Sequence, residues 1–199
     1  RILTHRSSVR FTNESIRIDS GWGSERTLVR RGSVSIPVSI KVRTKIRKER
    51  KEVQPGAEYS TALDLVDAIR DLPVAAIMVH GRSFEAGHSG SVDTDMIRQV
   101  KQAFPGLVLA NGGITKPSDV PDMLTQTGAD GVGIARGTWG QPWIFDQARQ
   151  LLETGSYTER GITDILQVLR EHAVLAEATK GQRGLIELRK HAVHYLRGY

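Results

Sequence analysis

Two short apolar segments that each run into glycines constrain the fold of this chain most strongly. The first reads L-V-L-A-N-G-G-I at residues 107–114, and the second reads G-A-D-G-V-G-I-A-R-G at residues 128–137. The residues between them have the apolar spacing of a helix, as at 118–127. A strand, a helix and a second strand in this order predict a β-α-β unit with two parallel strands.

The glycines lie just beyond the ends of the two predicted strands. Glycine at such a position most often serves a turn, because it adopts positive φ without steric cost. The alternative is a phosphate site, since the loops after the last two strands of a (β/α)₈ barrel turn backbone N–H groups toward an anion. In that case Asn111, Gly112 and Gly113 form one side of the site, and Arg136 and Gly137 form the other.

Two further apolar segments upstream predict two more strands. They read P-V-S-I-K-V-R at residues 37–43 and A-A-I-M-V-H-G-R at residues 75–82. Amphipathic patterns predict helices at residues 61–72 and 93–103 between the strands. Beyond a linker at residues 155–161, apolar spacing predicts two more helices, separated by Gly181.

These segments, in this order and spacing, resemble the second half of a tRNA-dihydrouridine synthase. The motifs are K-V-R, H-G-R-S, A-N-G-G-I and G-A-D-G-V-G-I-A-R-G-x-x-G-x-P-W-I-F, and the resemblance covers about residues 34–198. It implies an α/β fold, a partial TIM (β/α)₈ barrel with strands 5 to 8, followed by a small C-terminal helical domain. The implied division is an unmatched basic segment at 1–33, an FMN-binding half barrel at 34–153 and a helical tRNA-binding domain at 154–199.

The resemblance also implies an activity. Synthases of this family use FMN and NADPH to reduce uridine to 5,6-dihydrouridine in tRNA, on a base flipped out of the RNA. In the family a cysteine donates the proton, but this chain contains no cysteine. We therefore identify no catalytic residue and expect the chain to be truncated and inactive as written. The expected cofactor is FMN, the expected partner is tRNA, and the expected location is the cytoplasm, with no metal and no membrane segment.

By the same resemblance, Lys41 contacts the flavin, and His80 lies beside the flavin ring and the target base. The residues alone allow plainer roles. In these, Lys41 simply extends into water at the end of a strand, and His80 forms a hydrogen bond that only stabilises the fold. The expected cofactor-binding residues are Lys41, His80, Asn111, Gly112, Gly113, Ala135, Arg136 and Gly137. The expected tRNA-binding residues are Arg43, Arg82, Arg183, Arg189, Lys190, His191 and Arg197.

Two parts of the sequence, the loop at residues 83–93 and residues 1–33, differ from the family pattern. A third, Asp130, allows a structural role. The loop at residues 83–93 differs from the family at Ala86 and His88, which puts its substrate contacts in question. Asp130 leads into a predicted strand, where a carboxylate more often stabilises a turn than acts as an acid. Residues 1–33 show no sustained periodicity, so we expect a disordered or misframed segment, or else a basic arm that binds nucleic acid.

The charge of the chain is concentrated at its two ends. Residues 1–52 carry 14 Lys/Arg against 5 Asp/Glu, residues 53–179 carry 9 against 16, and residues 180–199 carry 5 against 1. Basic ends on an acidic body suit a protein that contacts a phosphate backbone, although a solvated basic surface has the same composition. On the last predicted helix, Arg183, Lys190, His194 and Arg197 lie opposite the apolar stripe with Arg189 at the margin. We call these five residues the basic ridge.

Two other functions fit the same residues. One is another FMN- or phosphate-binding TIM-barrel oxidoreductase, against which the basic ridge argues. The other is a non-catalytic remnant that binds RNA. In either case four strands leave two open sheet edges, which predict self-association.

Overall fold

The computed structural model of the chain describes residues 8–12, 15–19, 25–30, 37–47, 59–87 and 89–197. His88, and the residues at the two limits of the resemblance, 34 and 198, lie outside these residues. The chain splits into two compact units. Unit 1 is Arg1–Gly113 with Asp122–Gly133, and unit 2 is Ile114–Pro121 with Ile134–Tyr199.

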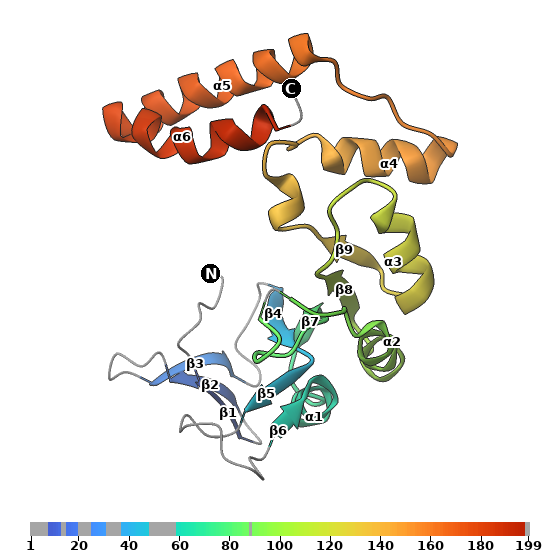
Figure 1. Ribbon diagram of the computed structural model, residues 1–199. Coiled ribbons are helices and arrows are strands. Elements are labelled where there is room, and N and C mark those ends of the chain that lie inside the picture. The colour runs from blue at the N-terminus through green and yellow to red at the C-terminus, as the bar shows by residue number, and fades with distance from the viewer. Residues whose placement is uncertain are drawn as a thin grey trace. The chain divides into compact units, whose positions relative to one another are not determined.

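A four-stranded parallel sheet forms the centre of unit 1 (Figure 1). Its strands are β4 (Val38–Arg43), β7 (Val74–His80), β8 (Leu107–Asn111) and β9 (Gly131–Gly133), and they pair in the order β4-β7-β8-β9. Helices α1 (Ala62–Ala68), α2 (Thr94–Ala103) and α3 (Asp119–Thr127) connect consecutive strands. The sequence therefore predicted the four strands and the alternating α/β order correctly. Consecutive parallel strands with a helix after each are also the arrangement found in a (β/α)₈ barrel.

Two of the predicted strands are shorter than their apolar segments. β8 ends at Asn111 because Gly112 and Gly113 have φ of 112° and 77°, which turns the chain out of the sheet. β9 contains only Gly131–Gly133, and the last two residues of the same apolar segment belong to a 3₁₀ turn, η1 (Arg136–Thr138). The Gly112-Gly113 pair therefore ends β8, as predicted, whereas Gly131 and Gly133 lie within β9 and Gly137 lies in η1.

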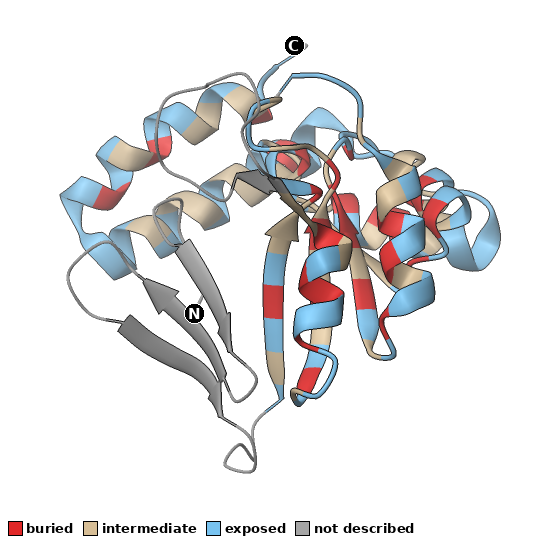
Figure 2. Ribbon diagram, turned by 90° about the horizontal axis from the view of Figure 1, so that it is seen from below, coloured by how far each residue is buried: buried red, intermediate tan, exposed pale blue. Residues whose placement is uncertain are grey.

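The strand register divides the side chains of the sheet between two faces. Hydrogen-bonded neighbours share a face, and alternate residues along a strand occupy opposite faces. Ile40, Ile77 and Val108 form one row, and all three are buried. The adjacent row on the opposite face contains Lys41, Met78, Leu109 and Gly131, which are exposed or half-buried. Figure 2 shows this alternation along the strands.

Local sequence explains where the helices of unit 1 begin. Thr61 caps α1 in a capping box, in which its hydroxyl accepts from the Asp64 N–H and the Asp64 carboxylate accepts from the Thr61 N–H. The Asp93 carboxylate caps α2 by accepting from the Met96 N–H at 2.9 Å. α1 ends at Ala68, before the predicted end at residue 72, although Ile69 remains buried beyond it.

The N-terminal segment differs from the expectation of no regular structure. The structure contains an antiparallel sheet of β1 (Ser8–Thr12), β2 (Ser15–Asp19) and β3 (Glu25–Arg30), paired in sequence order. After β4, a short strand, β5 (Lys45–Arg47), pairs with β6 (Tyr59–Thr61) in an antiparallel arrangement. The hypotheses of a misframed segment and of a basic arm stay predictions.

Unit 2 is helical. It contains η1, α4 (Ile144–Thr154), α5 (Ile162–Lys180) and α6 (Gln182–Tyr195), and Gly181 separates the last two as predicted. α5 and α6 lie side by side as an antiparallel pair (Figure 1). The contacts group α4 with these helices, whereas the sequence division placed it with the barrel. The three functional domains expected from the sequence stay a prediction. Among the described residues, no helix is both long and apolar enough to cross a membrane.

Gly184 sets the close approach of α5 and α6. A Cβ atom at this position would lie 2.0 Å from the carbonyl oxygen of Ala176 and 2.6 Å from its carbonyl carbon. Both are backbone atoms, so they cannot move aside as the end of a flexible side chain can. The two helices can therefore pack at this distance only with glycine at position 184.

We predict that Gly184→Ala lowers the free energy of unfolding by about 1 to 3 kcal/mol, the usual cost of overpacking. Alanine would otherwise stabilise a helix by up to about 1 kcal/mol over glycine, so helix propensity alone predicts the opposite sign. Urea unfolding followed by circular dichroism measures the change. The control is Gln182→Ala, an exposed position on the same helix. A Gly184→Ala variant at least as stable as the parent would contradict the close packing.

Candidate ligand site at the carboxyl ends of the strands

Four residues from four strands form one row at the carboxyl ends of the sheet. The register pairs Arg43 with His80, His80 with Asn111, and Asn111 with Gly133. The row lies on the same face as Lys41 and Met78, because these residues are two positions earlier on their strands. The structure thus brings three residues of the expected site, Lys41, His80 and Asn111, onto one face of the sheet.

Asn111 is the most buried polar residue of this row, with 4% of its surface exposed. Its Nδ2 donates to the carbonyl oxygen of Gly133 at 2.6 Å. The main-chain carbonyl oxygen of Asn111 accepts from the Gly81 N–H at 2.9 Å. These bonds join the ends of β7, β8 and β9, so Asn111 is held on both sides.

His80 is half-buried beside several cations. Its Nδ1 lies 3.4 Å from the carbonyl oxygen of Arg82. Burial is the main cause that lowers the pKa of His80 below its ordinary value, and the positive charges of Arg43 and Lys41 lower it further. The imidazole is therefore neutral at pH 7 and presents one donor and one acceptor.

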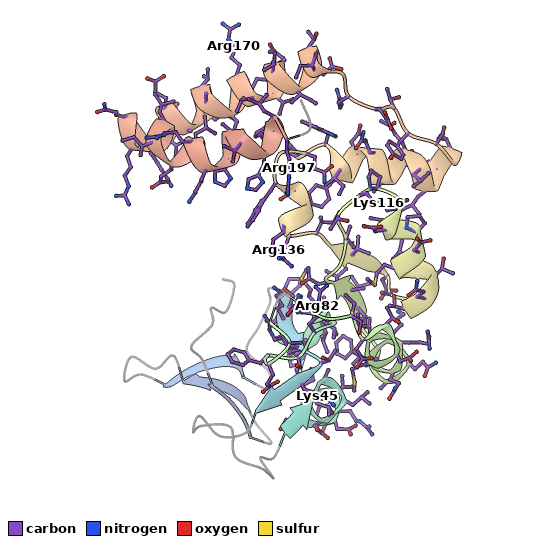
Figure 3. The ribbon with its side chains drawn as sticks, in the orientation of Figure 1. Lys45, Arg82, Lys116, Arg136, Arg170 and Arg197 are labelled. Carbon is purple, nitrogen blue, oxygen red and sulfur yellow. The ribbon has the colours of Figure 1, made fainter. Side chains whose placement is uncertain are left out.

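Arg43 and Arg82 stabilise the loop that follows β7. Arg43 donates to the carbonyl oxygen of Ser83 at 2.7 Å, and its guanidinium carbon lies 5.9 Å from the centre of the Phe84 ring. Arg82 donates from Nε to the carbonyl oxygen of Gly90 at 2.8 Å. Figure 3 places Arg82 on this loop. Both residues were expected to bind tRNA, which stays a prediction. In the structure each donates to a backbone carbonyl of this loop.

Gly112 and Gly113 form a tight turn next to His80. Their positive φ explains why glycine is needed at both positions. A Cβ atom on Gly112 would lie 3.4 Å from His80 Nε2 and 3.6 Å from an Arg82 nitrogen. The absence of a side chain thus leaves the backbone of this turn close to one imidazole and one guanidinium group.

The second glycine segment lies in unit 2. Ala135 precedes η1, and its carbonyl oxygen accepts from the Thr138 N–H at 2.9 Å. Gly137 is buried, and a Cβ atom there would lie 2.4 Å from the carbonyl oxygen of Ile114. Glycine at position 137 is therefore required by packing within unit 2. Arg136 belongs to the same 3₁₀ turn and is labelled in Figure 3.

Asp130 stabilises the fold, which is the role that the sequence favoured for a carboxylate just before a strand. Its carboxylate accepts from Lys101 Nζ at 2.7 Å and from the Val108 N–H at 2.7 Å. These contacts hold the end of α2 and the start of β8 together. Bonding to Lys101 and then to the Val108 N–H lowers the pKa of Asp130, so the group is ionised at pH 7.

An acidic residue of α6, Glu187, binds one member of the basic ridge. Glu187 accepts from Arg183 Nε at 3.0 Å and from Lys180 Nζ at 2.5 Å. His194 packs against the ring of Trp139, with centroids 5.3 Å apart. Arg189, Lys190 and Arg197 are exposed. Arg183 thus belongs to an ion-pair cluster, and Glu187 reduces the positive charge of the ridge.

An aromatic cluster fills the contact between α5 and α6. His172 Nδ1 lies 3.2 Å from the hydroxyl oxygen of Tyr195, and the rings of His172 and His191 are 5.8 Å apart. Burial and the charge of Lys190 lower the pKa of His191, so this expected tRNA contact is neutral at pH 7. Sequence reasoning missed the roles of His172 and Tyr195, although both lie at helical spacing on the apolar stripes. No group of three or more metal-ligating side chains occurs in the part of the chain that the structure describes.

The fold and the site define a class of protein. It is an α/β protein with a parallel sheet, in which a histidine, an asparagine and a glycine turn meet at the carboxyl ends of the strands. The sequence matches the dihydrouridine synthase (Dus) family over residues 27–199. The chain therefore belongs to this family, as the resemblance in its motifs indicated.

Several curated relatives carry the name tRNA-dihydrouridine synthase B. The chain is 31% identical to the protein of Shewanella oneidensis over 166 residues, which is 82% of this chain and 49% of the relative. The protein of Pectobacterium carotovorum gives the same identity and coverage. That of Pseudomonas putida is also 31% identical, with 47% of its length covered. The chain thus spans about half the length of the curated relatives it matches.

We predict that His80 titrates below its ordinary pKa of about 6.5. Because the folded-state pKa is below the unfolded-state pKa, the stabilising contribution is present above about pH 6.5 and is lost as the pH falls through the folded-state pKa. NMR titration of the His80 ring gives the midpoint, and urea unfolding between pH 5 and 7.5 gives the stability. A His80→Gln variant should lose less stability over this range than the parent. A His80 midpoint above 6.5 would show that the cations around it do not govern its protonation.

Proposed function

We propose that this chain provides part of an FMN- and tRNA-binding site of a flavin-dependent tRNA-dihydrouridine synthase. The reaction is the reduction of uridine to 5,6-dihydrouridine in tRNA, with NADPH as the reductant. Family membership supports this proposal, and the observation that carries it is the row of His80 and Asn111 beside the Gly112-Gly113 turn.

The described face of the sheet suits a flavin. Met78 and Leu109 offer apolar surface for a flat ring, and Lys41 lies in the same row as a cation that favours electron-rich ring atoms. A side chain at position 112 would occupy the space between the turn and His80. FMN, when bound, supplies hydride transfer. The protein residues orient it, and neutral His80 is available as a hydrogen-bond donor or acceptor.

Within unit 1, the phosphate of FMN is assigned to the backbone N–H groups of Gly112 and Gly113, which the glycine turn supports. The family resemblance, taken by itself, also assigns residues 135–137 of unit 2 to the cofactor. Arg136 supplies a permanent positive charge, which suits a phosphate dianion.

We predict that Arg136→Ala weakens FMN binding by about 1.5 to 3 kcal/mol, the range for a hydrogen bond to a charged group. Fluorescence titration of FMN with the purified chain measures the dissociation constant. Arg149→Ala removes an exposed arginine of α4 and serves as the control. Equal FMN affinity in the parent, Arg136→Ala and Arg149→Ala would refute the assignment of Arg136.

The basic ridge is proposed to contact the tRNA backbone. Its exposed members, Arg189, Lys190 and Arg197, can form ion pairs with phosphates, whereas Arg183 must share its charge with Glu187. Phosphate contacts position a protein on RNA without specifying sequence. We therefore expect weak binding with little sequence preference.

We predict that log affinity for tRNA falls with log salt concentration at a slope of roughly −2 to −4, for about three or four contacts of 0.7 to 0.9 each. The double variant Lys190→Ala/Arg197→Ala should flatten the slope by between about one and two units. Arg170→Ala is the control, because Arg170 projects from α5 on the side away from α6 (Figure 3). Sedimentation velocity should accompany the titration, since open sheet edges predict self-association. A double variant with the slope of the parent would show that the ridge is a solvated surface.

A further inference from the structure

Trp139 is an exposed aromatic residue in a segment that otherwise packs closely. Half of its surface, 50%, is exposed, and its backbone N–H donates to the carbonyl oxygen of Arg136 at 3.0 Å. Its ring contacts that of His194, near the end of α6, with the centroids 5.3 Å apart and the planes tilted by 44°. Trp143, four residues later, packs against the buried Tyr195 instead and is half-buried. Trp143 thus belongs to the packing of unit 2, whereas Trp139 presents half of its surface to solvent.

Gly140 fixes the position of Trp139 against α6. It has φ of 74°, and a Cβ atom there would lie 2.7 Å from the backbone nitrogen of Tyr195 and closer still to the carbonyl group of His194. These are backbone atoms of the last turn of α6, so only glycine allows this approach. The backbone of Trp139 is therefore held by the hydrogen bond to η1 on one side and by the contact with α6 on the other. An aromatic residue held in this way loses little conformational freedom when a ligand binds to it.

The charges around this ring pair suit RNA. The two segments that supply the rings, residues 134–145 and 188–199, contain no acidic residue. Lys190 precedes His194 by four residues, so the two side chains are neighbours on the surface of α6. Arg197 lies two residues beyond the end of this helix, and both cations are exposed. Proteins that bind single-stranded RNA combine such cations, which contact phosphates, with exposed aromatic rings on which unpaired bases stack.

We propose that Trp139, supported by His194, stacks on an unpaired base of the bound RNA next to the phosphates contacted by Lys190 and Arg197. The inference rests on the proposed tRNA-binding function. It adds a contact to a base, whereas the basic ridge supplies contacts to phosphates. Stacking needs only the π-face that every base has, so the resulting preference concerns unpaired over paired RNA and not the sequence.

Single-stranded RNA with and without bases tests the stacking. The probes are a short oligouridylate and an abasic oligonucleotide of the same length and charge. Trp139→Ala should weaken binding of the oligouridylate by about 5-fold or more, the lower end of the range for one base–aromatic stack, and leave the abasic probe unchanged. Trp139→Phe should retain most of the affinity. Trp139→Leu, which keeps apolar bulk without a ring, should lose it.

The control is Phe145→Ala, which removes another exposed ring of unit 2. Phe145 is 54% exposed but is followed by Asp146, so its variant should bind both probes like the parent. Circular dichroism checks that each variant folds. A Trp139→Ala variant that weakens both probes equally would show that Trp139 only supports the fold, and the proposal would be overturned. Unchanged affinity for the oligouridylate would also overturn it and leave the exposed ring to a partner of another class, such as a protein.

Salt dependence separates this inference from the proposed function. Trp139→Ala should lower the affinity for tRNA at every salt concentration and leave the slope of log affinity against log salt unchanged, because a stacked base releases no counterion. The double variant Lys190→Ala/Arg197→Ala should change the slope instead. If the double variant flattens the slope while Trp139→Ala binds like the parent, the tRNA contact of the ridge stands and the stacking is wrong. If the parent binds no RNA, the proposed tRNA-binding function fails, and the inference fails with it.

Discussion

The parallel register of β4, β7, β8 and β9 is the constraint on which the candidate site depends. It aligns Arg43, His80, Asn111 and Gly133 across four strands. The buried row of Ile40, Ile77 and Val108 maintains this register, because a slip of one residue would move every apolar side chain to the opposite face. The hydrophobic effect therefore positions polar groups that contribute little to the core themselves.

Charge around the sheet is arranged so that His80 stays neutral. Arg43 and Arg82 flank it, and each donates to a backbone carbonyl of the loop after β7. Burial is the main cause that lowers the pKa of His80, and the positive charges of Arg43 and Arg82 add to it. The same arginines thus order a loop and tune the protonation of the neighbouring histidine. A site of this kind favours anionic or electron-rich ligands, in agreement with family membership.

Much of the parallel sheet could be predicted from the sequence, whereas the N-terminal sheet could not. Apolar runs that end in glycine identified β7, β8 and their order. Each run spans several consecutive residues, so the pattern can be recognised without knowing which other residues it packs against. The signal for β1 and β2 was the alternation of Val9 with Phe11 and of Ile16 with Ile18 around Asn13-Glu14. That alternation is short and lies among many Arg and Ser residues, so it was interpreted as irregular sequence. The family match likewise begins at residue 27, earlier than the motifs indicated.

The sequence by itself determined where β8 ends, where α1 and α2 begin and which family the chain resembles. Those features depend on neighbours within a few residues, such as the Thr61–Asp64 capping box and the Gly112-Gly113 turn. Only the tertiary structure decided that Asn111 uses its amide nitrogen on Gly133, that Met78 fills the space at Gly133, and that Glu187 binds Lys180. The first two pairings join residues far apart in the chain, and the third crosses between two helices. Hydrogen-bond direction and side-chain volume act between such partners only after the backbone has brought them together.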